Sequence, residues 1–127
     1  MIIGVGTDIC RLERIEKLLR GDKKEAFLKR TFTEDEITSL PSEKRQVSYY
    51  AGRWAAKEAI AKCLGTGFGE QCRWLDITIE RLANGSPAVK LRDKTAETAQ
   101  KMGISSFHIS ISHEKEYAIA FAVAEKQ

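Results

Sequence analysis

Three short segments of the chain carry polar side chains of the kind that bind metals and phosphates. Asp8 follows an apolar segment, Glu58 and Lys62 stand four residues apart in an alanine-rich segment, and Ser112 and His113 lie between two alternating segments. Two carboxylates from separate elements suit Mg²⁺, which keeps several waters and commonly shares its remaining positions with substrate phosphates. A lysine one helical turn from a metal-binding glutamate would meet the same phosphate as a positive charge. Together the three segments predict a magnesium-dependent phosphate site.

Each of these segments also has an ordinary structural interpretation. Asp8 can simply cap the helix that follows it. Glu58 and Lys62 stand with the acid first, which is the order that forms a weak surface ion pair on a helix. His113 stands in a tight turn, where solvated polar residues are common. On these local patterns alone, both interpretations stay open.

The predicted secondary structure puts the candidate residues at the ends of strands and inside one long helix. Alternating or β-branched segments predict strands at residues 2–8, 75–82, 88–91, 107–112 and 118–123. Helical periodicity and breaker residues predict helices at 11–20, 24–29, a short one after Thr33, one from 43 or 44 to 64, and one at 94–102. Thr33 and Glu36 have capping-box spacing, which explains both residues structurally. Small residues at 52, 56, 59 and 63 form a stripe on the longest helix that lets another backbone approach.

Length and composition narrow the class of protein. The chain has 127 residues and 43% hydrophobic residues, which fits one domain with a real core. Three cysteines at positions 10, 63 and 72 form neither an even disulfide framework nor a C-x-x-C pair, so we expect reduced thiols. The apolar start ends at Asp8, far short of the ~20 residues that span a bilayer. We therefore expect a soluble cytoplasmic protein without a membrane partner.

Three motifs, taken in order, resemble the holo-[acyl-carrier-protein] synthases, the small bacterial type of the 4′-phosphopantetheinyl transferase superfamily. They are V-G-T-D-I at residues 5–9, R-W-A-A-K-E-A-I-A-K-C-L-G at 53–65 and I-S-I-S-H at 109–113. The resemblance covers nearly the whole chain, including F-T-x-x-E at 32–36 and N-G-S-P at 84–87. Trp54 and Cys63 replace a commoner phenylalanine and alanine, and neither change removes a charged group. A Walker loop, a zinc H-E-x-x-H motif and a G-x-S-x-G elbow are absent.

The resemblance implies an α+β fold, with an antiparallel sheet packed on a long helix in a single domain (1–127). It also implies a homotrimer with its sites at subunit interfaces. The implied reaction moves the 4′-phosphopantetheine group of coenzyme A to a serine of apo-acyl carrier protein. Adenosine 3′,5′-bisphosphate is released, and the reaction supports fatty acid biosynthesis.

The resemblance also implies roles for particular residues. Asp8 and Glu58 would hold Mg²⁺, with Mn²⁺ as the alternative metal, and Lys62 would neutralise a phosphate oxygen. The other implied coenzyme A contacts are Lys44, Arg53, Gly65, Ser112 and His113. The proton acceptor stays open among Glu58, a metal-bound water and Asp35, with Glu58 ranked first because it would be nearest the metal.

A basic segment indicates how an acidic carrier protein would bind. Residues 11–30 hold eight basic and four acidic side chains, whereas the whole chain has a net charge of only +3. We call the side chains of Arg14, Lys17, Leu18 and Arg20 the basic face, and expect it to dock the carrier protein. A merely solvated helix face is the alternative.

Two other classes of function compete with the transferase. The basic helix could belong to a nucleic-acid-binding module, but no aromatic residues are interleaved with its charges for base stacking. The net charge is also too small for a protein that coats nucleic acid, so we expect no nucleic-acid partner. A non-catalytic carrier-binding scaffold is the other alternative, and the intact Asp8, Glu58 and Lys62 argue against it.

Overall fold

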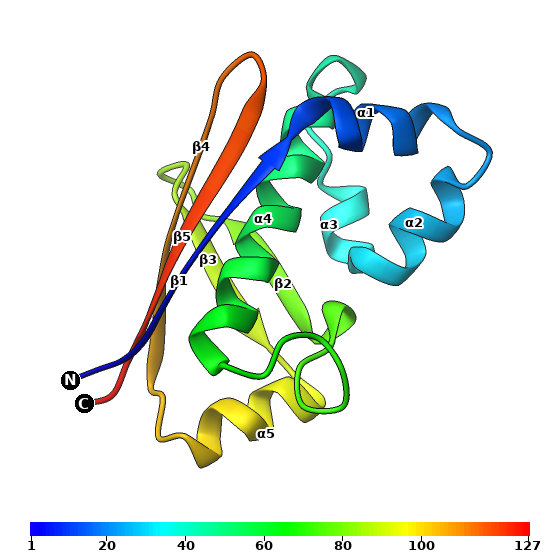
Figure 1. Ribbon diagram of the computed structural model, residues 1–127. Coiled ribbons are helices and arrows are strands. Elements are labelled where there is room, and N and C mark those ends of the chain that lie inside the picture. Colours follow the sequence, from blue (N-terminus) through cyan, green and yellow to red (C-terminus); the bar gives the residue numbers. More distant parts are fainter.

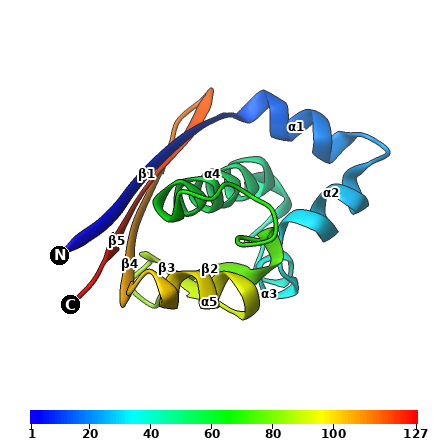
Figure 2. The ribbon, with the colours of Figure 1, turned by 60° about the horizontal axis from the view of Figure 1, so that its bottom comes forward.

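The computed structural model describes residues 1–127 and is built around one long helix, α4 (Figures 1 and 2). The elements in chain order are β1 (Ile2–Arg11), α1 (Leu12–Arg20), α2 (Lys24–Thr31), α3 (Glu34–Thr38), the 3₁₀ turn η1 (Glu43–Arg45), α4 (Gln46–Leu64), the 3₁₀ turn η2 (Trp74–Asp76), β2 (Ile77–Arg81), β3 (Pro87–Leu91), α5 (Asp93–Lys101), β4 (Ser106–His113) and β5 (Tyr117–Glu125). Figure 2 shows α4 between the β1–β5–β4 sheet on one side and the β2–β3 hairpin on the other. The expected α+β fold, with an antiparallel sheet on a long helix, is confirmed.

The three-stranded sheet has β5 in its centre, between β1 and β4, and both pairings are antiparallel. Four alanines at positions 118, 120, 122 and 124 of β5 are buried. Gly4, Gly6 and Asp8 of β1 pair directly with three of these alanines. Because paired residues point to the same face of a sheet, Asp8 lies on the buried face, which packs against α4.

Two glycines let β1 approach α4 closely. A methyl group on Gly6 would lie 1.9 Å from the carbonyl oxygen of Ala59, and one on Gly4 would lie 2.3 Å from that of Cys63. Ala59 and Cys63 of the small-residue stripe thus admit the backbone of β1, whereas Gly52 of the same stripe faces Ile111 of β4. Gly65 ends α4 in the left-handed conformation at φ 73°, as its position after the helix predicts.

Most element boundaries differ from the expected ones by one or two residues, and three differences have a clear structural cause. The long helix begins at Gln46, because residues 43–45 form a separate 3₁₀ turn. β1 runs three residues beyond Asp8, to Arg11, since its pairing with β5 continues to Tyr117. The strand expected at 75–82 begins only at Ile77. There the Asp76 carboxylate accepts hydrogen bonds from the backbone N–H and the hydroxyl of Thr95, which hold the preceding residues in a turn against α5.

The short helices between β1 and α4 pack beside α4, at the right in Figure 1. The capping box at the start of α3 is confirmed: the Glu36 N–H donates to the Thr33 hydroxyl, and the Thr33 N–H donates to the Glu36 carboxylate. None of the helices combines the length and the apolar character that crossing a membrane requires.

Candidate active site

Asp8 and Lys62 meet where β1 crosses the C-terminal half of α4. The Lys62 ammonium donates a hydrogen bond to the carbonyl oxygen of Thr7 at 2.7 Å and lies 3.4 Å from Asp8 Oδ1. The close approach at Gly6, two residues earlier on the same face, brings the Asp8 carboxylate within reach of the helix. The Asp8 side chain is only 15% exposed, whereas that of Lys62 is 53% exposed. Lys62 therefore reaches this carboxylate from the solvent side.

Glu58, one helical turn before Lys62, completes a pair of acids. Burial, with the negative charge of Asp8 second, raises the pKa of Glu58. Burial also raises the pKa of Asp8, although its hydrogen bond with Lys62 opposes the rise. Burial is the largest cause of both shifts, and the positive charge of Lys62 only partly offsets it. A further cation would stabilise the charged form of both carboxyls.

The donor set fits Mg²⁺. Asp8 Oδ2 is buried and has no hydrogen-bond partner, which leaves one carboxylate oxygen available to a ligand. The structure has no cluster of three or more histidine, cysteine, aspartate or glutamate side chains that could hold a metal. Mg²⁺ needs no such cluster, because one or two carboxylates, waters and substrate phosphates commonly complete its shell. Asp8 and Glu58 supply that number of carboxylates.

Arg14 links the basic face of α1 to this pair of acids. Its positive charge partly opposes the rise in the pKa of both Asp8 and Glu58. Its guanidinium lies 4.9 Å from the centre of the Trp54 ring. Trp54 is the first ring of a stack, which we call the aromatic column. The column consists of Trp54, Trp74 and Phe68, with ring centres 5.7 Å apart in the first pair and 3.8 Å in the second.

The other two cations of the basic face, Lys17 and Arg20, are exposed. Lys17 pairs with Glu13 and Arg20 with Glu16, each at 3.2 Å and one turn apart along α1. Exposed pairs of this kind contribute little to stability, so both cations remain available to a charged partner. Leu18 is partly buried and packs against the core. The structure thus leaves the cations of the expected docking face accessible, and of these Arg14 acts on the two acids.

Arg53 and His113 line a cleft of about 200 Å³, and Asp8, Glu58 and Lys62 are not among its lining residues. Arg45 and Arg81 add two further cations to its wall, so the cleft suits an anionic ligand. The Arg53 guanidinium stacks on Tyr49 at 3.9 Å, and its buried Nε has no hydrogen-bond partner. Burial lowers the pKa of Arg53. An adjoining cavity of about 410 Å³, also lined by Arg53, contains Asp35.

The other expected coenzyme A contacts are divided between places. Gly65 ends α4, three residues after Lys62. Lys44 lies in η1 beside Arg45, and Ser112 lines a third hollow with Ile9 and Ile119. One chain therefore brings the two acids and Lys62 together, but not the whole expected set. Arg45, Arg81 and the aromatic column had no motif that singled them out, because isolated basic and aromatic residues are common on protein surfaces.

Comparison with known proteins places this geometry in a family. The family model of the 4′-phosphopantetheinyl transferase superfamily matches residues 4–122. The chain belongs to this superfamily of transferases. It is 42% identical over 127 residues to the holo-[acyl-carrier-protein] synthase of Hydrogenovibrio crunogenus, covering 100% of this chain and 99% of that protein. It is 43% identical to the synthase of Clostridium novyi, covering 98% of this chain and 88% of that protein.

Solved structures of the superfamily have the same fold. The holo-[acyl-carrier-protein] synthase of Neisseria meningitidis is 38% identical with a TM-score of 0.91, and the match covers 99% of this chain and 100% of that one. The Helicobacter pylori synthase was solved in complex with coenzyme A. It is 35% identical with a TM-score of 0.83, over 95% of this chain and 99% of that one. The resemblance based on three motifs is thus confirmed over the whole chain.

Proposed function

We propose that the chain transfers the 4′-phosphopantetheine group of coenzyme A to a serine of apo-acyl carrier protein. The serine oxygen forms a bond to the phosphorus that carries pantetheine. The bond from that phosphorus to the bridging oxygen breaks, and adenosine 3′,5′-bisphosphate leaves. The observation that carries the proposal is the Asp8–Glu58 pair beside Lys62, in a chain whose relatives are named for this synthase activity. We further propose a role in fatty acid biosynthesis. We also propose a cytoplasmic location, because the three cysteines are free thiols.

Asp8 and Glu58 are the residues that would hold Mg²⁺, or Mn²⁺ in its place. When bound, the metal neutralises charge that develops on the pyrophosphate during transfer. The unpaired Asp8 Oδ2 and the raised pKa values of both carboxyls support this assignment. Lys62 would turn from Asp8 towards a phosphate oxygen, because its ammonium is exposed and bound to only one backbone carbonyl and this carboxylate.

Glu58 is the proton acceptor that we propose for the serine hydroxyl. Its raised pKa makes it a better base than an ordinary solvated glutamate. Asp35, the other candidate side chain, lines the cavity beside Arg53 and not the place where Asp8 and Lys62 meet. A metal-bound water stays an alternative.

The cleft lined by Arg53 and His113 is where we propose that the nucleotide end of coenzyme A binds. Its three arginines provide the positive charge that the 3′-phosphate requires. A synthase of Bacillus anthracis, 36% identical with a TM-score of 0.82, was solved with coenzyme A (3′,5′-ADP). Lys44, Gly65 and Ser112 stay proposals for the same ligand. The acidic carrier protein would dock on the basic face of α1.

We also propose a homotrimer with its sites at the subunit interfaces. The sheet face opposite α4 exposes Val5, Ile9, Ile119 and Phe121, each between 43% and 61% exposed. An apolar row of this kind marks a protein interface. The acids and the cationic cleft lie apart within one chain, and a neighbouring subunit would bring the cleft of one chain to the acids of another.

Mixing two inactive variants tests this shared site. Asp8→Ala and Arg53→Ala trimers, each with little activity, are unfolded and refolded together at equal amounts. If each site combines Asp8 of one subunit with Arg53 of its neighbour, about a quarter of the sites in random trimers regain both residues. No recovery, with mixed trimers shown by native mass spectrometry, would contradict the proposal.

The decisive test of the reaction is a mass-shift assay with apo-acyl carrier protein, coenzyme A and Mg²⁺. The carrier should gain the mass of one phosphopantetheine group, and a chelator should abolish the gain. A carrier that a known synthase modifies serves as the positive control. No gain with that carrier would sink the proposed function.

A further inference from the structure

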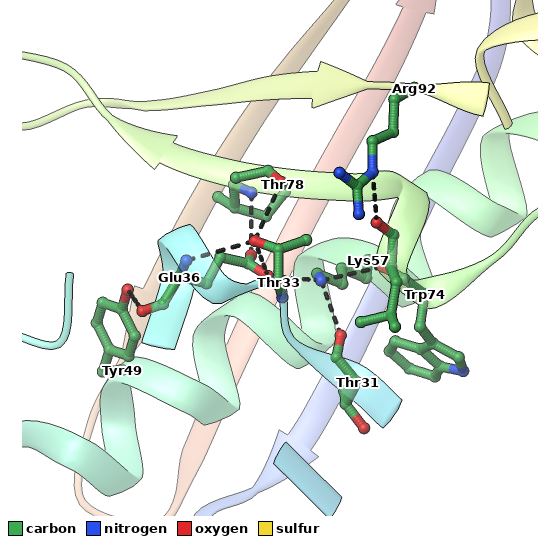
Figure 3. A network of polar contacts seen from close by, with 10 residues as sticks. Thr31, Thr33, Glu36, Tyr49, Lys57, Trp74, Thr78 and Arg92 are labelled. Atoms are coloured by element: carbon green, nitrogen blue, oxygen red, sulfur yellow. Dashed lines mark hydrogen bonds and ion pairs between the residues drawn. The ribbon is translucent and has the colours of Figure 1, made fainter. Parts of the chain in front are cut away.

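Lys57, the residue before Glu58, is fully buried on the side of α4 that faces α2, α3 and η2 (Figure 3). Its ammonium donates to the carbonyl oxygen of Thr31 at 2.8 Å, to Glu36 Oε1 at 2.7 Å and to the carbonyl oxygen of Trp74 at 3.1 Å. A lysine has three N–H donors, so every donor has a partner. The three acceptors come from three different segments of the chain.

Glu36 closes the network from the other side. Its Oε1 also accepts the N–H of Thr33 at 2.9 Å, and its Oε2 accepts the N–H of Ile79 at 3.0 Å. Tyr49 donates its hydroxyl to the backbone carbonyl of Glu36 (Figure 3). The capping-box glutamate is therefore also the counter-ion of Lys57, and it joins α3 and β2 to α4.

Stability alone accounts poorly for this buried ion pair. Burial lowers the pKa of Lys57, and only the charge and hydrogen bond of Glu36 oppose that shift appreciably. Removing two charges from water costs much of what their attraction returns, and apolar replacements of such pairs are often neutral. What an apolar side chain cannot replace is the pair of hydrogen bonds from Lys57 to the carbonyls of Thr31 and Trp74.

One of those carbonyls belongs to the helix that follows the basic face, and the other belongs to a residue of the aromatic column. Thr31 is the last residue of α2, which follows the basic face of α1. Trp74 begins η2 and is the middle ring of the aromatic column, and the column's first ring stacks with Arg14. Lys57 thus holds both segments at a fixed distance from α4, one residue before Glu58.

We propose that Lys57 is a positioning residue that fixes the carrier-docking surface relative to Glu58. The docking surface here means the basic face of α1 together with the aromatic column. Lys57 acts through the carbonyls of Thr31 and Trp74 and touches no reacting group, because it is fully enclosed. The expected change in the KM for the carrier protein rests on the proposed function. The positioning of Thr31 and Trp74 by Lys57 does not depend on the reaction.

Two single variants separate positioning from stability. Lys57→Met removes both carbonyl hydrogen bonds while keeping a long side chain of similar volume. Glu36→Gln is the control: it removes the buried negative charge and one backbone N–H bond to residue 36, but leaves Lys57 its two carbonyl acceptors. If Lys57→Met fails to fold because Glu36 is left unpaired, the Lys57→Met/Glu36→Gln double variant takes its place, since it buries no charge.

Steady-state kinetics are measured at a temperature where every variant is folded. We expect Lys57→Met to raise the KM for the carrier protein by about tenfold or more, with the KM for coenzyme A changed by less than about twofold. Glu36→Gln should leave the carrier KM within about twofold of the wild-type value. Equal changes in both variants, or equal changes for both substrates, would overturn the proposal.

A spectroscopic measurement tests the same idea without the reaction. Trp54 and Trp74 are the two tryptophans of the chain, and their stacked rings should give an exciton couplet in circular dichroism. Lys57→Met should diminish the couplet, and Glu36→Gln should retain it. An unchanged couplet in folded Lys57→Met refutes the positioning role. If the wild-type protein modifies no carrier, the proposed function fails, and the couplet alone still decides whether Lys57 holds Trp74.

Discussion

Replacing Gly6 by alanine should displace the strand that carries Asp8. The added methyl group would lie 1.9 Å from the Ala59 carbonyl oxygen, against the 3.4 Å at which ordinary contact begins, a shortfall of 1.5 Å. The obstacle is helix backbone, which cannot turn aside as a flexible side chain would. β1 must therefore move away from α4 by an appreciable part of that distance. Asp8, two residues along on the same face, would move with it.

The size of the effect follows from this displacement. Forced overpacking costs about 1–3 kcal/mol, and a rigid obstacle puts Gly6→Ala at about 3 kcal/mol. For a chain of this length that lowers the Tm by roughly 10 °C. Because a misplacement of about 1 Å at a reacting centre costs about a hundredfold, the transfer rate should fall by a similar factor at temperatures where the variant is folded.

Thermal unfolding and the mass-shift assay measure the two effects of Gly6→Ala. Gly69→Ala is the matched control, because no atom lies within 4 Å of its added methyl group and Gly69 has no positive φ. That control should keep the wild-type rate and gain up to about 1 kcal/mol from a stiffer unfolded chain. A Gly6→Ala protein with wild-type Tm and rate would refute the role assigned to this contact.

Three further predictions concern buried titratable groups. Asp8→Ala and Glu58→Ala should each lower the transfer rate by about a hundredfold or more, with the Tm unchanged or raised because carboxylate repulsion is relieved. The folded pKa of Glu58 is raised, so its contribution to the free energy of unfolding falls as pH rises from about 4.5 through that folded pKa. Millimolar Mg²⁺ should therefore raise the Tm more at pH 7 than at pH 4.5 in thermal scans, and an equal rise would contradict the site. Burial raises the thiol pKa of Cys10, Cys63 and Cys72 to about 11. A maleimide at pH 7 should therefore label these thiols only after unfolding. Mass spectra that show rapid labelling of the folded chain would contradict the raised thiol pKa values.

Local patterns predicted most elements of this fold. The capping box at Thr33, the end of α4 at Gly65 and the hairpin before Pro87 depend on a few neighbouring residues, and the structure confirms each of them. The expected strand at 75–82 was wrong at its start, because the Asp76 side chain binds Thr95 of a distant helix. No window of local sequence contains that contact.

The candidate site was also predictable only in part, because some of its contacts join residues far apart in the sequence. Asp8, Glu58 and Lys62 were singled out by charge and by motif, and the structure brings them together. Lys57 was passed over, although it falls on the same stripe of α4 as the buried Tyr50 and Leu64. A lysine at such a position is usually interpreted as solvated, because the glutamate that pairs with it lies 21 residues earlier in the chain. The pairing becomes visible only in the folded structure.

The order of strands in the sheet delays the folding of the chain during its synthesis. β1 is made before the other described elements, yet it pairs only with β5, which is made after them. Until β5 has left the ribosome, β1 and β4 have no strand to pair with, and the part of α4 that β5 covers stays open. Such long-range pairing slows folding and leaves apolar surface open in the meantime. A nascent chain that stalls before Tyr117 would thus present an unfinished sheet.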